Sequence, residues 1–222
     1  MTSTGPELVA LTRRDRKRLA TRDTIRHAAL ELFVERGFDE VTVEQVASRA
    51  DVAPSTFFRH FETKEDVVLH DYPQRALDLF HAFEVLPDHL APMEAVVGAL
   101  AGWESTRRDP DVLRAEARIV ADTPRVAARL SRILESWERP VARQLRRFFP
   151  ATSEPLEADL LAAWTIATVR VVITHWYRSG ADADLFAAGR DALLALSRDM
   201  GALASIDLVG APAPDHGSGR AK

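Results

Sequence analysis

The chain contains no cysteine, which excludes disulfide bonds and thiolate metal sites and favours a reducing cytoplasm as its location. It also has no alternating runs of β-branched residues, so the abundant Ala, Leu, Glu and Arg predict an all-α protein. Its N-terminus is too polar for a secretory signal peptide. The most apolar stretch, residues 160–177, contains Arg170 and His175, so we expect no membrane-spanning segment and no membrane partner.

Motifs of common catalytic sites are missing as well. The sequence has no G-x-S-x-G, G-x-G-x-x-G, P-loop or H-E-x-x-H motif. The two E-x-x-H repeats of a di-iron helical bundle are also absent. We therefore expect no enzymatic activity, no cofactor and no metal site.

The charge is distributed unevenly along the 222 residues, whose net charge is −4. Between Arg13 and Arg26, seven Lys or Arg stand against two Asp, a local charge of +5, so the rest of the chain carries −9. This asymmetry is typical of a protein that approaches phosphates by one end. We interpret residues 1–18 as a flexible arm, whose basic part lies along phosphates or enters a minor groove.

Residues 42–64 predict two short helices joined by a tight turn. Thr42 and Gln45 have the spacing of a capping box at the start of the first helix. Pro54 suits the first turn of the second helix, residues 54–61, which buries Phe57 and Phe61 at i, i+4. A preceding helix, residues 19–36, has an apolar stripe and would complete a three-helix core. The core residues that we expect are Ile25, Leu32, Phe33, Phe38, Val46, Ala47, Phe57 and Phe61.

The same stretch resembles the N-terminal domain of TetR-type transcriptional regulators. The resemblance rests on the lead-in Gly37-Phe38-Asp39-Glu40-Val41-Thr42, the run Thr56-Phe57-Phe58-Arg59-His60-Phe61 and the triplet Lys64-Glu65-Asp66, and it covers about residues 20–72. It implies a helix-turn-helix DNA-binding domain over residues 19–72, with a double-stranded DNA operator as partner. The chain departs from the family pattern at two positions: Ala53 replaces the commoner Ser, and Phe58 replaces the commoner Tyr.

The candidate DNA-binding residues are Thr42, Pro54, Ser55, Thr56, Phe58, Arg59, His60 and Lys64. In the family, the positions of Pro54 and Ser55 touch base edges, and those of Thr56, Phe58, His60 and Lys64 mostly hold the DNA backbone. Thr42 opens a helix N-terminus that can hold a phosphate. Arg59 is suited to guanine, with a phosphate contact as the alternative. His60 is either a contact or a packed histidine without a role.

Residues 73–205 predict a larger helical domain for ligand binding and dimerisation. Thr63 caps a helix from Lys64 to about Glu84, with a break near Tyr72 because Pro73 follows. In the family this helix relays ligand binding to the DNA-binding helices. Further helices are expected over residues 93–107, 110–122, 124–149, 156–178 and 184–203. Pro140 should kink the third of these, and residues 206–222 should be disordered.

The helix over residues 160–177 is apolar nearly all round, so it must be covered on every side. A second copy of the chain is the simplest cover, and we expect a homodimer through helices 156–178 and 184–203. Two DNA-binding helices would then lie about 34–36 Å apart, which predicts a near-palindromic operator.

The effector is expected to be large and apolar, in a pocket lined by aromatic side chains with a few polar anchors. The candidate ligand-binding residues are Phe80, Trp103, Arg118, Trp137, Trp164, Arg170 and Thr174. Arg170 lies on an apolar helix, so it should either bind a ligand carboxylate or phosphate or pair with Glu104 or Glu116. Tryptophans are more often part of a core than of a pocket.

These expectations describe a ligand-responsive DNA-binding regulator, most simply a repressor that a small molecule releases from its operator. The alternative is a helical dimeric module that binds protein instead of DNA. The salt dependence of binding separates the two hypotheses. Affinity for DNA falls steeply as the salt concentration rises, because binding releases counterions from the phosphates.

Overall fold

The computed structural model describes residues 12–104, 109–178, 187, 189–195 and 198. Within these residues the regular elements are all helical, which confirms the all-α prediction. The predictions for residues 1–11 and 206–222, and for much of the helix over residues 184–203, lie outside the described residues. None of the helices that the structure describes combines the length and the apolar character that a membrane crossing requires.

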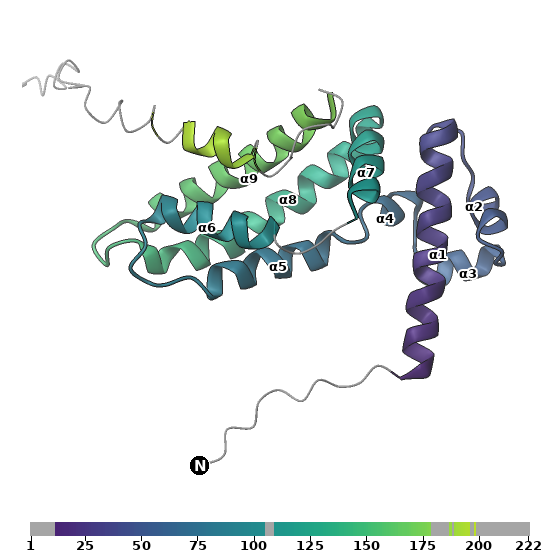
Figure 1. Cartoon of the computed structure of the whole chain (residues 1–222), viewed down its shortest axis with the longest axis horizontal. Coiled ribbons are helices and arrows are strands. Elements are labelled where there is room, and N and C mark those ends of the chain that lie inside the picture. Colours follow the sequence, from purple (N-terminus) through teal and green to yellow (C-terminus); the bar gives the residue numbers. More distant parts are fainter. Residues whose placement is uncertain (1–11, 105–108, 179–186, 188, 196–197, 199–222) are drawn as a thin grey trace, which may run out of the picture.

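Three helices form the N-terminal module: α1 (Arg13–Arg36), α2 (Val43–Arg49) and α3 (Pro54–His60). Helices α2 and α3 pack against each other and against the same side of α1 (Figure 1). The expected capping box is present, since the amide of Gln45 donates to Oγ1 of Thr42 at 3.3 Å and the amide of Thr42 donates to Oε1 of Gln45 at 2.9 Å. Gly37 ends α1 with a φ of 92°, a conformation that suits glycine.

The core of this module is the one expected from the sequence. The eight predicted core residues are all buried, and Phe57 and Val46 are fully inaccessible to solvent. Phe57 and Phe61 pack with ring centroids 5.7 Å apart, and Phe33 and Phe38 with centroids 4.7 Å apart. Burying these aromatic rings orients α3 so that its other side faces outward.

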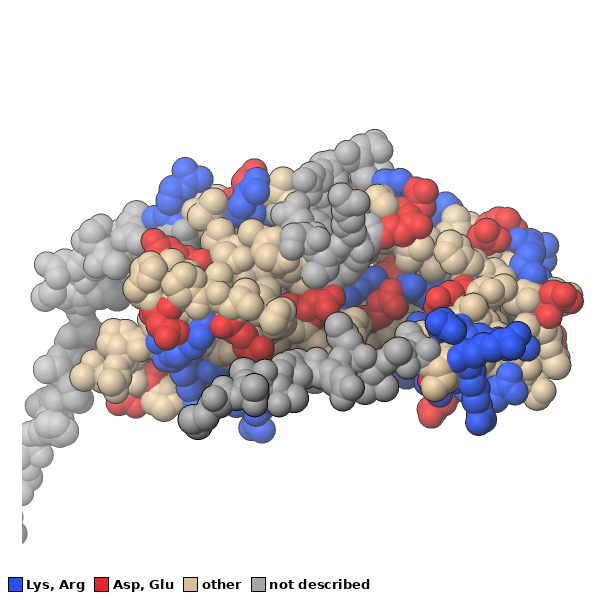
Figure 2. All heavy atoms as spheres, turned by 60° about the horizontal axis from the view of Figure 1, so that its bottom comes forward, with Lys and Arg blue, Asp and Glu red and all other residues tan. Residues whose placement is uncertain are grey.

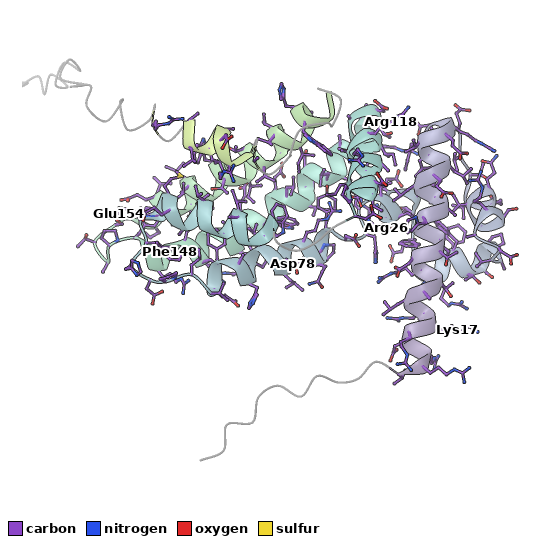
Figure 3. The ribbon with its side chains drawn as sticks, in the orientation of Figure 1. Lys17, Arg26, Asp78, Arg118, Phe148 and Glu154 are labelled. Carbon is purple, nitrogen blue, oxygen red and sulfur yellow. The ribbon has the colours of Figure 1, made fainter. Side chains whose placement is uncertain are left out.

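The first helix begins at Arg13 and not at Leu19, so the prediction of a flexible arm is wrong for residues 13–18. The reason is a second capping box, in which Oγ1 of Thr12 accepts from the amide of Asp15 at 3.2 Å and the Asp15 carboxylate accepts from the amide of Thr12. The basic residues are thereby held on a helix. This part of α1, which carries Lys17, extends beyond α3 (Figures 1 and 3).

The predicted break near Tyr72 is confirmed, because α4 (Lys64–Val68) ends before α5 (Tyr72–Glu84) begins with Pro73 in its first turn. The remaining elements are α6 (Pro92–Glu104), α7 (Pro110–Asp122), α8 (Pro124–Leu145), the 3₁₀ turn η1 (Arg146–Phe148) and α9 (Pro155–Arg178). Helix α5 packs on α6 and α8, and α8 runs along α9. Helix α7 contacts α8 and α9 and also reaches α1, so it joins the two parts of the molecule (Figure 1).

Candidate DNA interface and effector cavity

The outward side of α3 consists of small and polar residues with one aromatic ring. Ser55, Phe58 and Arg59 are exposed, Phe58 to 55% of its surface, whereas Thr56 and His60 are half-buried. Ala53 makes no side-chain hydrogen bond at the helix start, as its difference from Ser predicts. The side of α3 opposite Phe57 is thus free to contact a large partner such as DNA.

The first turns of α1 add positive charge beside α3. Burial, followed by the charges of Arg59, Arg18 and Arg22, lowers the pKa of His60 below its ordinary value. Arg18 and Arg22 must therefore lie near the end of α3, and Figure 2 shows Lys and Arg gathered at this end of the molecule. Sequence reasoning assigned Arg18 to an arm, and it counted Arg22 in the basic stretch but did not name it as a DNA-binding residue. Their i, i+4 spacing was the signal, because it places both on one face of a helix.

Thr42 is exposed at the start of α2, and its hydroxyl oxygen is engaged by the amide of Gln45 at 3.3 Å. A backbone hydrogen bond of Glu44, followed by one from the Thr42 side chain, lowers the pKa of the Glu44 carboxyl, so a phosphate at Thr42 must compete with this carboxylate. Lys64 lies differently from the other candidates. Its Nζ donates to the carbonyls of Phe38 at 2.7 Å and of Val41 at 2.6 Å.

The environment of Lys64 explains why it points inward. Its ammonium lies 4.7 Å from the centroid of the Phe38 ring, and burial and the charge of Arg125 lower its pKa. Lys64 therefore positions the loop that leads into Thr42, and only its third N–H remains for a phosphate.

A narrow apolar cavity of about 60 Å³ lies among α5, α6, α7, α8, α9 and the last described helical residues. Aliphatic side chains form most of its wall, Tyr72 and Trp103 supply aromatic surface, and Thr168 supplies a hydroxyl. Two charged residues, Arg75 and Arg190, also line it. Ligand pockets usually measure about 300–1,000 Å³, so an effector of ordinary size can enter only if these helices separate.

Of the seven predicted ligand-binding residues, the structure places only Trp103 on this cavity. Trp137 is buried between Tyr72 and Trp103, with ring centroids 6.2 and 6.4 Å away. Phe80 and Trp164 are half-buried and pack against the core. Thr174 donates its hydroxyl to the carbonyl of Arg170 at 3.0 Å.

The two predicted arginines lie on the outside. Arg118 is exposed and lies 3.8 Å from Asp122, one turn along α7. Arg170 is exposed in a separate hollow with Glu135 and Glu138. The predicted pairing of Arg170 with Glu116 is wrong, because Glu116 binds other residues, and the side chain of Glu104 lies outside the described residues.

The buried carboxylate of Glu116 on α7 instead joins two arginines of different helices. Arg26 of α1 and Arg75 of α5 each form an ion pair with one of its two oxygens, and Arg26 also binds Asp71 at 2.7 Å. Sequence reasoning missed this cluster. The signal was a charged residue within an apolar stripe, since Arg75 lies on the buried face of α5 between Tyr72 and Leu79.

A second set of ion pairs connects the start of α8 to α4 and to Asp39, which lies between α1 and α2. Arg125 binds Asp39 and Glu65, each at 3.0 Å, and its guanidinium lies 5.0 Å from the Phe38 ring centroid. Arg129 pairs with Asp66 and donates to Oγ1 of Thr63 at 3.0 Å. Ion pairs therefore connect the two parts of the molecule at two places, in addition to the buried apolar cluster that runs through both.

Comparison with known proteins places this geometry in context. The family model for bacterial regulatory proteins of the tetR family matches residues 25–70. The chain is 35% identical over 199 residues to the HTH-type transcriptional regulator TcmR of Streptomyces glaucescens. This match covers 83% of this chain and 82% of TcmR. It is 25% identical over 190 residues to the putative mycofactocin biosynthesis transcriptional regulator MftR of Mycobacterium tuberculosis, across 80% of this chain and 95% of MftR.

Solved structures share the fold at lower identity. FadR from Bacillus subtilis in complex with stearoyl-CoA superposes with a TM-score of 0.56 at 18% identity, across 78% of this chain and 96% of that one. FadR from Thermus thermophilus in complex with lauroyl-CoA superposes with a TM-score of 0.53 at 24% identity, across 87% and 98%.

Proposed function

Because the chain belongs to the TetR family of bacterial transcriptional regulators, it is a DNA-binding regulator and not an enzyme, and we propose that it acts as a ligand-responsive dimeric repressor. It binds a near-palindromic operator and leaves it when an apolar effector enters the helical domain. The observation that carries this proposal is that one chain combines two features. The exposed sides of α1 and α3 carry basic residues, and the helical domain contains an apolar cavity. Helix α7 lines this cavity and contacts α1.

In this proposal α3 enters the major groove. Pro54 and Ser55 approach base edges, and Arg59 donates to O6 and N7 of a guanine. Phe58 touches a thymine methyl group or a sugar, because its exposed ring has no hydrogen-bond donor. Thr42, Thr56, His60 and the third N–H of Lys64 face phosphates. Arg18 and Arg22 add phosphate contacts from α1, beside the end of α3.

The proposed dimer is formed by α9 and by the helix that the sequence predicts over residues 184–203. Leu156, Leu160 and Val171 of α9 are exposed to 62%, 60% and 56% in the single chain. A second copy covers these side chains and places the two α3 helices about 34–36 Å apart, so that they reach successive major grooves.

The proposed release is a population shift. The cavity must widen to accept an effector, and α7, which lines it, carries Glu116, which binds Arg26 of α1. Asp71, the residue before α5, also binds Arg26. Separation of these helices therefore changes the angle at which α1 and α3 are presented. When the two α3 helices no longer match successive major grooves, the dimer dissociates from the operator.

The test is selection of bound duplexes from random DNA by the purified full-length protein. We expect enrichment of an inverted repeat whose half-sites lie about one helical turn apart. Affinity for the enriched duplex should fall steeply with salt, in proportion to the phosphates neutralised. Recovery of no preferred duplex, even at low salt, contradicts the proposal and favours a protein-binding module.

A further inference from the structure

We propose that Arg75 binds the anionic headgroup of an apolar acid in the cavity, and that this competition with Glu116 weakens the link between the helical domain and α1. The inference rests on the proposed function, because it names the chemistry of the effector and the residues that transmit its presence. It concerns the same cavity but assigns a residue and a ligand class to it.

Arg75 is the buried polar group of the cavity wall. Its side chain is only 7% exposed, and its guanidinium lies 4.5 Å from the centroid of the Tyr72 ring. Its Nε has no hydrogen-bond partner among the described residues. A buried donor without a partner is costly, so an oxygen of a ligand in this cavity gains more here than at a solvated site.

The rest of the wall selects the body of the ligand. Leu134, Val169 and Leu193 offer aliphatic surface, and Tyr72 and Trp103 offer aromatic surface. An apolar chain or ring system carrying one terminal carboxylate fits this division. A carboxylate presents two oxygens to the fork of a guanidinium, which a neutral oxygen group cannot match.

The charges around Arg75 explain why a bound acid must compete with Glu116 for the guanidinium of Arg75. Arg26, Arg75, Asp71 and Glu116 form a cluster with two positive and two negative charges. Burial disfavours the charge of Arg75, but Glu116 outweighs burial and raises the pKa of Arg75 above its already high ordinary value. A third carboxylate at Arg75 adds an uncompensated negative charge, so it repels Glu116 from the shared guanidinium.

Movement of Glu116 reaches the DNA-binding module directly. Its other oxygen pairs with Arg26 of α1, and Arg26 lies where α1 faces α7 (Figure 3). Arg26 also binds Asp71, the residue immediately before α5. A shift of α7 relative to α5 therefore pulls on α1, against which α2 and α3 pack.

Arg190 is the competing candidate, because it lines the same cavity. It is exposed and pairs with Asp191 at 3.3 Å, so its charge is already solvated. An acid that bound Arg190 would stay at the surface and would not touch the Glu116 cluster. Arg190→Gln is therefore the matched control for Arg75→Gln.

The experiment uses the full-length protein and two probes with the same apolar body, decanoate and decan-1-ol. Binding of each probe is measured without DNA by calorimetry, and the operator affinity is measured with and without each probe. We expect decanoate to bind the unaltered protein more tightly than decan-1-ol and to lower its operator affinity by about 5–150-fold, the usual range of allosteric coupling.

Two variants separate headgroup binding from transmission. Arg75→Gln should remove the preference for decanoate over decan-1-ol, whereas Arg190→Gln should keep it. Glu116→Gln should bind decanoate at least as tightly as the unaltered protein, because the competing charge is gone, but decanoate should no longer change its operator affinity. A merely structural role for Glu116 would lower stability without removing this coupling. If Arg75→Gln fails to fold, Arg75→Lys replaces it; this variant keeps the charge but lacks the forked donors, so the preference for decanoate should weaken without vanishing.

Several results overturn the inference. Equal binding of the two probes, or no binding of either, contradicts an acid site, and loss of the preference in Arg190→Gln alone moves the headgroup to the surface. Full coupling in Glu116→Gln contradicts the route through the cluster. If no operator duplex is selected, the proposed function fails, but calorimetry without DNA still decides whether Arg75 binds the acid.

Discussion

The N-terminal module and the helical body expose opposite kinds of surface. In α1–α3 the large apolar rings other than Phe58 are inside, Phe57 completely, and the outer surface carries arginines. In the body, Leu160 of α9 is 60% exposed and an apolar cavity lies between the helices. The module is complete as a single chain and offers charge to a partner, whereas the body leaves apolar surface that only other molecules can cover.

The two regions share one buried apolar cluster, and ion pairs also connect them. The ion pairs are those of Arg125 and Arg129 with residues of α4, the pair of Arg125 with Asp39, and the Arg26–Glu116–Arg75 cluster. Ion pairs depend strongly on geometry and on neighbouring charge, so an incoming charged group can rearrange them.

The largest expected effect comes from opening the core of the module. Phe57→Ala should cost about 3–5 kcal/mol of unfolding free energy, because it leaves a cavity at a fully buried site, and DNA binding should be lost. Phe58→Ala, one residue on, is the control, since its exposed ring contributes little to the core. Thermal and denaturant unfolding followed by circular dichroism measures both. Equal destabilisation by the two substitutions would contradict the orientation of α3.

The next effect tests the incomplete surface of the body. Leu160→Glu should separate the dimer, and operator affinity should fall by about 10²–10⁴-fold because avidity is lost. Leu77→Glu is the matched control, since Leu77 on α5 is 59% exposed but lies outside the proposed interface. Sedimentation equilibrium gives the oligomeric state. A dimer that persists in Leu160→Glu places the interface elsewhere.

A smaller effect separates base recognition from phosphate binding. Arg59→Ala should weaken operator binding by about 1–3 kcal/mol and relax the preference at one base pair, as loss of a guanine contact does. Arg49→Ala serves as the control, because Arg49 already pairs with Glu31 and Glu35. Binding to a panel of single-base operator variants is the measurement. A uniform loss across the panel, with a shallower salt dependence, identifies Arg59 as a phosphate contact.

The smallest effect is a pH dependence at His60. Burial and Arg59, Arg18 and Arg22 lower the pKa of His60 in the protein without DNA. Phosphates near His60 counter those arginines and raise its pKa, so the complex takes up a proton and operator affinity rises as pH falls below about 6.5, the ordinary pKa of histidine. The gain is at most about tenfold per pKa unit.

His60→Gln supplies the control for this dependence. It should bind the operator with little change of affinity between neutral and mildly acidic pH, as measured by fluorescence anisotropy. An unchanged pH dependence in this variant would assign the titration to another group, for example His70, whose pKa burial and Arg22 also lower.

The helix boundaries that local chemistry determines were predictable. Thr42 with Gln45, Pro54 and Gly37 act through their nearest neighbours, so their spacing identified α2, α3 and the end of α1. Pro73 likewise marked the break before α5. The start of α1 was not predicted, because the dense positive charge of residues 13–18 is typical of an unfolded arm, whereas the Thr12–Asp15 capping box holds these residues in the helix.

The cavity was not predictable in the same way. Trp103 was placed on it correctly, whereas Arg118 and Arg170 turned out to be exposed, because the direction of a side chain on a largely apolar helix depends on which neighbours pack around it. Arg26, Arg75 and Glu116 come from three helices and lie up to 90 positions apart in sequence. No local pattern brings them together.

For this protein, the amino-acid sequence alone determined the helices of the DNA-binding module and the family to which the chain belongs. Caps, turns and apolar periodicity act over a few residues and need no knowledge of the rest of the chain. Only the tertiary structure decided which arginine lies inside the cavity wall and which carboxylate it shares with α1. Burial and ion pairing are properties of packed helices, and they arise only when distant segments come into contact.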